Sequence, residues 1–327
     1  MRMLSTSRRD LETAAAALRD GLLVALPTET VYGLGGDAWN PRALARIFAA
    51  KERPAFDPLI VHVADPERAA EVAELHRAHT LELMERFWPG PLTLILPKLP
   101  RVPDLATSGL PTVAVRCPAH PVAREIIRLA GVPVAAPSAN PFGYLSPTTA
   151  GHVAAQLGER VDFIVDGGPC AVGVESTVLD LSADPPLVLR PGGLPVEAIA
   201  ELVPGVQVFD RATTSPRAPG QLPSHYAPGT PLRLLPAGAL AGARPGDGAA
   251  AICFGSASRS RVEEGGRFRR VVDLSPARDP VEAAAALFSI LHELDGQGWS
   301  GLWAERLPEA GLGRAVNDRL YKASVKE

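Results

Sequence analysis

Cysteine is scarce in this chain of 327 residues, and its three cysteines are far apart. Cys117, Cys170 and Cys253 form no CxxC pair and no cysteine–histidine cluster with zinc-ligand spacing, so we expect no protein-built metal site. Their odd number disfavours a disulfide framework and indicates a reducing compartment, the cytoplasm. No apolar run approaches the ~20 residues of a membrane span, and the N-terminus lacks a signal-peptide pattern. We therefore expect a cytoplasmic protein with no membrane partner.

The chain also lacks a large net charge of either sign. The formal net charge is −3 at pH 7, which disfavours a broad basic surface for nucleic acid but leaves room for a local basic cleft. Hydrophobic residues make up 46% of the chain, enough for sizeable cores. The sequence contains no GxxxxGK[ST] and no GxSxG motif, and Gly33, Gly35 and Gly36 do not satisfy GxGxxG. Any nucleotide site must therefore be built in another way.

Alternating strand-like and helix-like segments predict an α/β fold with a mixed sheet and flanking helices. The length is about twice that of a common domain, which indicates two domains. We place a catalytic domain at residues 1–205, a proline-rich linker at 206–230 and a smaller, Rossmann-like α/β domain at 231–327. The linker stretch RATTSPRAPGQLPSHYAPGT has four prolines and no apolar periodicity.

Capping signals predict several helices in the first domain. Ser7 can cap a helix that Gly21 would end, and Asn40 followed by proline can cap a second helix that runs to about Lys51. The apolar pattern predicts two further helices at residues 66–77 and 80–87.

The stretch PTETVYGLGGDA, residues 27–38, follows an uncharged apolar strand expected at 22–26. It combines hydroxyls, one carboxylate and three glycines, which is typical of ligand loops at strand ends in α/β proteins. We expect Gly33, Gly35 and Gly36 to form a turn in which backbone N–H groups approach a ligand closely. An ordinary surface turn is the alternative interpretation.

Further polar and cationic side chains follow at the ends of expected strands and helices. Each has an ordinary alternative: helix-end cations complement the dipole, a strand histidine is a core residue, and an arginine makes a surface salt bridge. Their recurrence at the same kind of place favours one polar cleft across a sheet. The residues are Lys51 and Arg53 in KERP, His62 in PLIVHV, Arg116 in TVAVR, Ser138 and Asn140 in PSAN, Ser176 in EST, and Arg190 in LRPGG.

Taken in order, these segments resemble the YrdC-domain family, the threonylcarbamoyl-adenylate synthases. The matching pieces are PTETVYGLGGDA, KERP, PLIVHV, TVAVR, PSAN, SPTT, ESTVLDL and LRPGG, which cover most of residues 20–195. The linker PGQLPSHYAP and the ending GLGRAVNDRLYKAS are similar to the long form of the family, which has an extra C-terminal domain. The resemblance implies a YrdC-like twisted sheet for the first domain.

The resemblance also implies a reaction, in which L-threonine, bicarbonate and ATP, with Mg²⁺, give threonylcarbamoyl-AMP and pyrophosphate. A separate tRNA threonylcarbamoyl transferase would then complete the tRNA modification; direct tRNA binding by this chain is left undecided. Carried over by position, the L-threonine site would contain Thr30, His62, Arg116 and Ser176. The ATP site would contain Lys51, Arg53, Asp57, Thr112, Ser138, Asn140, Ser146, Arg190 and Tyr226, with Lys51 and Arg53 as catalytic residues.

Two features depart from the family pattern. Asp57 stands where an uncharged or basic residue is common, and a carboxylate beside a triphosphate is unfavourable unless it helps to hold the metal. The linker has Gln221, Leu222 and Pro223 where some members are rich in lysine and arginine. A linker that closes over the cleft would still exclude water from a labile carbamate.

Two other functions are considered. A carbamoyltransferase of the hydrogenase-maturation type would be much longer and would carry zinc-finger cysteines, which this chain lacks. An RNA-binding or ribosome-maturation module would show interleaved basic and aromatic residues, and the negative net charge disfavours it. Adenylate formation that depends on threonine and bicarbonate would separate the enzyme from both.

Overall fold

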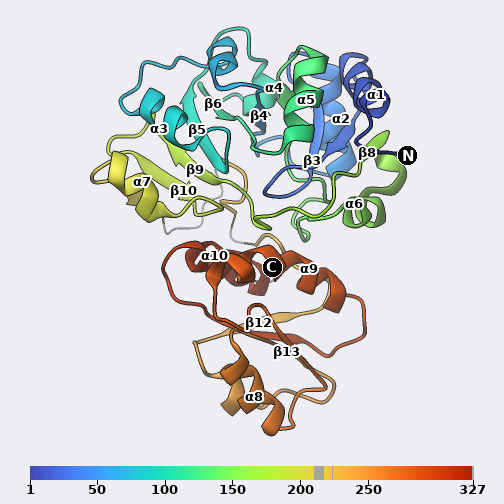
Figure 1. The fold of residues 1–327 in the computed structure, drawn as a ribbon, viewed down its shortest axis with the longest axis vertical. Helices are drawn as coiled ribbons and strands as arrows, with labels where there is room; N and C mark the ends of the chain where they lie inside the picture. The colour runs from blue at the N-terminus through green and yellow to red at the C-terminus, as the bar shows by residue number, and fades with distance from the viewer. Residues whose placement is uncertain (210–216, 223, 326–327) are drawn as a thin grey trace.

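The computed structural model describes residues 1–209, 217–222 and 224–325, which form two lobes (Figure 1). The upper lobe in Figure 1 contains a large sheet, and the lower lobe contains a small one. Residues 210–216 and Pro223 of the expected linker lie outside the described residues.

The first sheet has eleven strands and is mixed. Strand β4 runs parallel to β6, whereas β5 runs antiparallel to β6 and parallel to β9. The expected mixed sheet is therefore confirmed. From edge to edge the strands are β1 (Arg2–Leu4), β8 (Phe163–Val165), β2 (Val24–Leu26), β3 (Gly33–Asp37), β7 (Val134–Ala135), β4 (Ile60–His62), β6 (Thr112–Arg116), β5 (Leu92–Pro97), β9 (Thr177–Asp180), β10 (Leu187–Arg190) and β11 (Gln207–Val208).

Helices flank this sheet and begin where the capping signals predict. Ser7 accepts a hydrogen bond from the backbone of Asp10, and Asn40 caps the second helix from both Arg42 and Ala43. The helices of the first lobe are α1 (Arg8–Arg19), α2 (Pro41–Lys51), α3 (Thr80–Phe87), α4 (Asp104–Thr107), α5 (Pro121–Ala130), α6 (Ala150–Leu157) and α7 (Val196–Leu202).

The second lobe is a smaller α/β domain, as expected. Its four strands are all parallel, in the order β12 (Leu232–Leu235), β15 (Leu302–Glu305), β13 (Ala250–Cys253) and β14 (Arg270–Asp273). Helices α9 (Pro280–Leu294) and α10 (Leu312–Ser324) face the first lobe, and α8 (Ser256–Glu264) lies on the far side (Figure 1). Helix α8 was not predicted because its sequence, SASRSRVEE, has no apolar periodicity.

Two local predictions were wrong. The glycines expected in a turn form the fully buried strand β3, which pairs with β2 and β7. Glycine is needed there for close packing: a Cβ on Gly35 would meet the Val24 carbonyl oxygen and Val134 Cγ1, each at 3.0 Å. The helix expected at 66–77 is only a short 3₁₀ segment, Pro66–Glu71.

The described part of the linker packs against both lobes. Ala218 is buried on the first sheet in a cluster with Ile60 and Ala114. Tyr226 is buried in the core of the second lobe, with its ring 5.8 Å from that of Phe288. A move of one lobe against the other must therefore disturb the linker.

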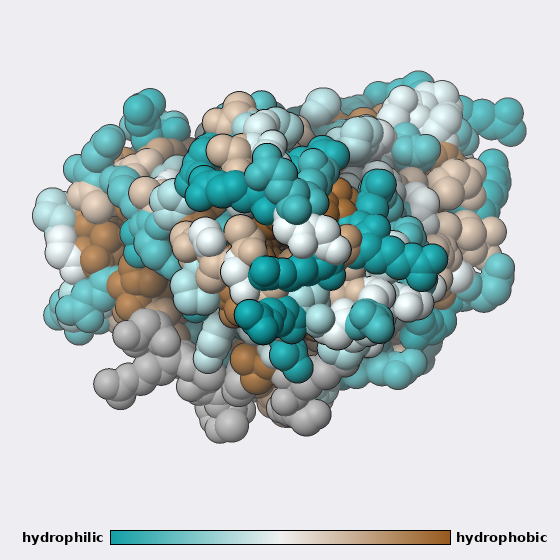
Figure 2. Space-filling model, turned by 90° about the horizontal axis from the view of Figure 1, so that it is seen from below, coloured by the Kyte–Doolittle hydropathy of each residue, from teal (hydrophilic) through white to brown (hydrophobic). Residues whose placement is uncertain are grey.

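No helix in the described residues is long and apolar enough to cross a membrane. Hydrophilic side chains cover much of the surface seen from the end of the second lobe, with hydrophobic groups scattered between them (Figure 2). The large hydrophobic side chains that the structure describes as exposed are Met1, Met3, Phe56, Leu81, Val281 and Tyr321.

The packing around Gly35 makes a stability prediction. Gly35→Ala should lower the free energy of unfolding by about 1–3 kcal/mol, because the new methyl group has no room in the sheet. The control is Gly151→Ala in α6, where the nearest atom to the added Cβ is Thr149 Oγ1 at 3.7 Å. This helical substitution should raise stability by up to about 1 kcal/mol. Denaturant unfolding measures both, and equal effects would contradict the packing argument.

Candidate functional site

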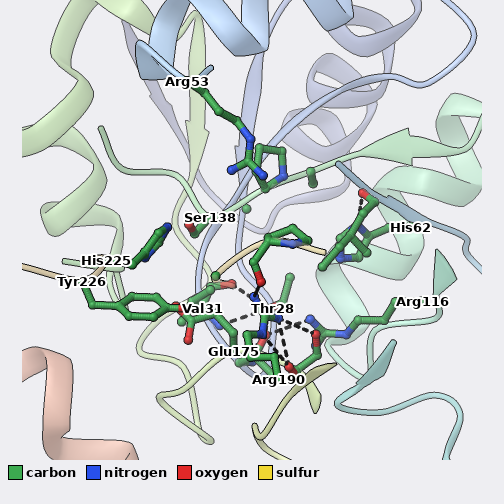
Figure 3. Close-up of a pocket in the computed structure, with 18 residues that line it drawn as sticks. Thr28, Val31, Arg53, His62, Arg116, Ser138, Glu175, Arg190, His225 and Tyr226 are labelled. Atoms are coloured by element: carbon green, nitrogen blue, oxygen red, sulfur yellow. Dashed lines mark hydrogen bonds between the residues drawn. The ribbon is translucent and has the colours of Figure 1, made fainter. Parts of the chain in front are cut away.

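A cavity lies between one face of the first sheet and the linker. Segments far apart in sequence meet there: His62 and Arg116 lie on one side, His225 and Tyr226 on the other, and Arg53 lies above (Figure 3). Strand register explains the convergence, because the parallel strands β4 and β6 bring His62 directly opposite Arg116. The start of β9 and the end of β10 reach the same edge of the sheet.

One end of the cavity is a network of hydroxyls around an ion pair. The Arg116 guanidinium donates to Thr30 Oγ1 at 2.9 Å and lies 2.6 Å from Glu29 Oε1. Thr28 Oγ1 is 2.9 Å from Thr30 Oγ1 and donates to the Val31 carbonyl. Glu29 offsets the charge of Arg116 but does not line the cavity, so this end presents the Arg116 cation and the Thr28 and Thr30 hydroxyls to a ligand.

His62 lies beside this network and is neutral at physiological pH. Its side chain is buried, and Nδ1 is 3.2 Å from the Ile60 carbonyl oxygen. Burial, together with the charge of Arg116, lowers the pKa of His62 to about 3. The imidazole therefore offers a hydrogen-bonding group without a charge.

The other end of the cavity is cationic. Arg53 is buried, and its guanidinium donates to the carbonyls of Asp57 and Pro58. Arg190 donates to the Ser176 carbonyl at 2.9 Å and to the Pro219 carbonyl of the linker at 3.1 Å. The buried guanidinium groups of Arg53 and Arg190, together with the hydroxyl of Ser138 in the PSAN loop, suit a phosphate chain.

Lys51 lies behind the wall of the cavity. Its ammonium donates to the carbonyls of Ser138 and Asn140, both at 2.5 Å, and so holds the PSAN loop from behind. Burial and the nearby charge of Arg53 place the pKa of Lys51 well below its usual value. Asn140 uses its amide to donate to the carbonyls of Pro141 and Tyr144.

Asp57 is a buried carboxylate, 3.0 Å from the Arg53 guanidinium. Neither of its oxygens makes a hydrogen bond within the described part of the chain. Burial raises its pKa, although Arg53 and Lys51 act against this shift. No group of three or more His, Cys, Asp or Glu side chains that could hold a metal ion occurs among the described residues.

A second buried carboxylate, Glu175, lines the cavity and was missing from the expected site. It accepts a hydrogen bond from Ser146 and another, at 2.7 Å, from Arg319 of helix α10. Tyr226 lies close by, at a positive φ of 61°. Gly220 faces it with φ 80°, and a Cβ at Gly220 would lie 2.5 Å from the Tyr226 hydroxyl oxygen, so only glycine fits.

The structure brings most of the expected site residues together and places the others just outside the cavity. Thr112 begins β6, two residues before Ala114, which pairs with Ile60 on the cavity floor. Thr112 therefore lies toward the Arg53 end, because Arg53 donates to the Pro58 carbonyl just before the parallel strand β4. The expected residues that line the cavity are Thr30, Arg53, His62, Arg116, Ser138, Ser176, Arg190 and Tyr226, and those that do not are Lys51, Asp57, Thr112, Asn140 and Ser146.

Three residues with polar or charged side chains that line the cavity were not proposed from the sequence: Thr28, Glu175 and His225. All three lie within motifs that the sequence already indicated, namely PTET, EST and HYAP. The available signal was their position beside an expected site residue. The contact of Glu175 with a distant helix could not be read from any local pattern.

Residues 16–192 match the family model Sua5/YciO/YrdC, described as "Telomere recombination". Residues 194–325 match the model "Threonylcarbamoyl-AMP synthase, C-terminal domain". The chain belongs to the Sua5/YciO/YrdC family. Both parts of the family's two-domain form are thus present.

Full-length Sua5-type relatives are similar over nearly the whole chain. A threonylcarbamoyl-AMP synthase from Pyrococcus abyssi is 42% identical, covering 96% of this chain and 94% of the relative. One from Bacillus subtilis is 40% identical, covering 98% and 94%. The crystal structure of Pyrococcus abyssi Sua5 complexed with L-threonine has a TM-score of 0.87 at 37% identity, covering 99% of this chain and 98% of that one.

The lowered pKa of His62 predicts part of the acid sensitivity of this family member. Below pH 6.5 the unfolded chain binds a proton at His62, whereas the folded chain does not until about pH 3, so falling pH favours unfolding. At pH 5 this difference amounts to about 2 kcal/mol. His62→Gln should therefore lose about 2 kcal/mol less stability than the wild type between pH 8 and pH 5. Denaturant unfolding at both pH values checks this, and equal losses would contradict it.

Proposed function

We propose that this chain is an L-threonylcarbamoyladenylate synthase, which converts L-threonine, bicarbonate and ATP into threonylcarbamoyl-AMP and pyrophosphate. The observation that carries the proposal is a single cavity with two chemically different ends. A hydroxyl-rich end around Thr30 and Arg116 suits an amino acid, and a cationic end around Arg53 and Arg190 suits a triphosphate. Similarity to threonylcarbamoyl-AMP synthases over nearly the full length supports it.

We assign Thr30, His62, Arg116 and Ser176 to L-threonine. Arg116 provides a fixed cation for the carboxylate of the amino acid, and the neutral His62 provides an uncharged polar partner. The Ser176 hydroxyl accepts from Arg190, which we assign to ATP below, and lies 2.8 Å from Thr93 Oγ1. Ser176 would therefore link the bound L-threonine to an arginine that binds ATP.

We assign Arg53, Ser138, Arg190 and Tyr226 to direct contact with ATP. Asp57, Thr112, Asn140 and Ser146 lie outside the cavity lining, so we assign them to holding the walls of the ATP site. Lys51 holds the PSAN loop through two hydrogen bonds, and negative phosphates nearby would favour its charged form, which burial disfavours in the free protein. With Arg53 it would stabilise charge that develops on the phosphates.

Chemistry in this site depends mainly on position and charge. The threonine amine would bond to the carbon of bicarbonate as a C–O bond breaks and water leaves, which gives a carbamate. A carbamate oxygen would then bond to the α-phosphorus of ATP as the bond to the bridging oxygen breaks and pyrophosphate leaves. Arg53 and Arg190 would stabilise the negative charge that collects on the leaving group. The linker, with Ala218 buried on the sheet, would keep water from the carbamate.

Mg²⁺ would bind mainly to the phosphates, because the described residues include no cluster of three metal-binding side chains. The donor chemistry allows one protein ligand, Asp57, a buried carboxylate that pairs with Arg53 and makes no hydrogen bond among the described residues. When bound, the ion would neutralise phosphate charge.

The product would pass to a downstream tRNA threonylcarbamoyl transferase, because an acyl adenylate is a reactive donor for transfer to an acceptor amine. The three cysteines are unpaired and buried, which suits a reducing compartment, so we place the reaction in the cytoplasm.

The direct test is formation of an AMP adduct and pyrophosphate by the purified full-length protein. Both products should require L-threonine, bicarbonate and ATP together, and omission of any one should abolish them. ATP hydrolysis that ignores threonine, or RNA binding with no adduct, would overturn the proposal.

The two ends of the cavity should respond differently to single substitutions. Thr30→Ala removes the hydroxyl that Arg116 holds, so it should weaken L-threonine binding about tenfold or more and ATP binding much less. Ser138→Ala is the matched control at the other end, with the opposite order expected. Calorimetric titration of each ligand measures both, and the reverse pattern would refute the assignment.

A further inference from the structure

Arg319 is the largest fully buried side chain of the described chain, and it comes from the C-terminal lobe. It lies on helix α10, which faces the first lobe (Figure 1). A buried guanidinium is costly unless its donors are satisfied, so its partners should reveal its role.

The partners of Arg319 lie in the wall of the cavity rather than in its own lobe alone. Nε donates to Glu175 Oε2 at 2.7 Å, and Nη1 donates to the Pro191 carbonyl at 2.9 Å and to the neighbouring Asp318. The guanidinium carbon also lies 5.0 Å from the centre of the Tyr226 ring, a cation–π contact. One side chain thus joins three segments of the first lobe and linker.

The contact with Arg319 offsets the negative charge of Glu175 in the cavity wall. Glu175 lines the cavity, and a free carboxylate there would repel the phosphates of a nucleotide. Burial alone would raise its pKa, but the charges of Arg319 and Arg190 outweigh burial and hold the pKa at about 2. The carboxylate is therefore ionised yet neutralised, and it keeps Ser146 in place through its other oxygen.

The same face of α10 also holds the linker. Lys322, one turn beyond Arg319, donates to the Gly220 carbonyl at 2.7 Å and pairs with Asp318 at 2.7 Å. The backbone N–H of His225 is directed at the Lys322 carbonyl, at 3.4 Å. Helix α10 therefore contacts both the linker and the Glu175 wall.

We propose that Arg319 is a positioning residue for ATP, which neutralises Glu175 and supports the Tyr226 ring so that the C-terminal lobe completes the nucleotide end of the cavity. This inference rests on the proposed function only for the identity of the nucleotide. It gives the C-terminal lobe a chemical task beyond carrying the linker.

The first test is ATP binding to full-length Arg319→Met, measured by calorimetry without threonine or bicarbonate. Methionine keeps the buried volume but leaves Glu175 with an unpaired charge, so ATP affinity should fall at least about tenfold. L-Threonine affinity should change by less than about threefold, which also shows that the variant is folded.

Arg314→Met is the matched control on the same helix. Arg314 also joins α10 to the first lobe, by a half-exposed ion pair of 3.1 Å with Glu197, but it lies outside the cavity. If Arg319 served only to dock the lobes, both variants would weaken ATP binding alike. We expect Arg314→Met to bind ATP as the wild type does.

Charge rescue provides the decisive comparison. The double variant Arg319→Met/Glu175→Gln removes the unpaired carboxylate while the glutamine can still accept from Ser146, so it should recover most of the lost ATP affinity. Arg319→Lys keeps a cation but loses the forked geometry, so its affinity should lie between those of the wild type and Arg319→Met.

Three results would overturn the inference: wild-type ATP affinity in Arg319→Met, an equal loss in Arg314→Met, or no recovery in the double variant. Failure of the proposed function would look different. A wild-type protein that binds ATP but forms no threonine adduct would refute the reaction, while the comparison of ATP affinities would still decide the role of Arg319.

Discussion

Buried positive charge is the constraint on which the rest of the site depends. Five cationic side chains are buried among the described residues: Lys51, Arg53, Arg116, Arg190 and Arg319. Each donates to at least one backbone carbonyl of a loop in or behind the cavity wall or next to a strand that ends there. The same contacts therefore satisfy buried donors and fix these loops. A cavity built in this way is positively charged before any ligand arrives, and it need not reorganise to receive phosphate.

Much of the fold could be predicted from local signals. The caps of α1 and α2 followed from residue types and spacing, since a cap depends on neighbours in sequence. The alternation of strand and helix segments along the chain predicted the mixed sheet. The glycines of β3 were misjudged because their role is tertiary: they let neighbouring side chains approach the strand, and composition alone cannot distinguish this from a turn. Helix α8 was missed because its sequence has no apolar face from which a helix could be predicted.

The site was predictable as a set of motifs but not as a set of contacts. Strand-end placement located Thr30, Arg116 and Arg190 because the sheet brings strand ends together. Nothing local distinguished a residue such as Lys51, which supports the wall from behind, from one that lines the cavity. The partnership of Glu175 with α10 spans 144 residues of sequence, so it could be found only once the lobes were placed together.

The strand order also constrains how the chain is made. Strand β1, at the very N-terminus, pairs with β8, which ends at Val165, and β5 pairs with β9 across more than eighty residues. During synthesis the first strand therefore has no partner until the ribosome has released half of the polypeptide. Such long-range pairing slows folding and leaves unpaired strand edges exposed in the meantime. For a growing chain, α1 offers β1 little cover, because a 12-residue helix is marginal on its own in water, so the apolar residues of the nascent N-terminus stay exposed until β8 is made.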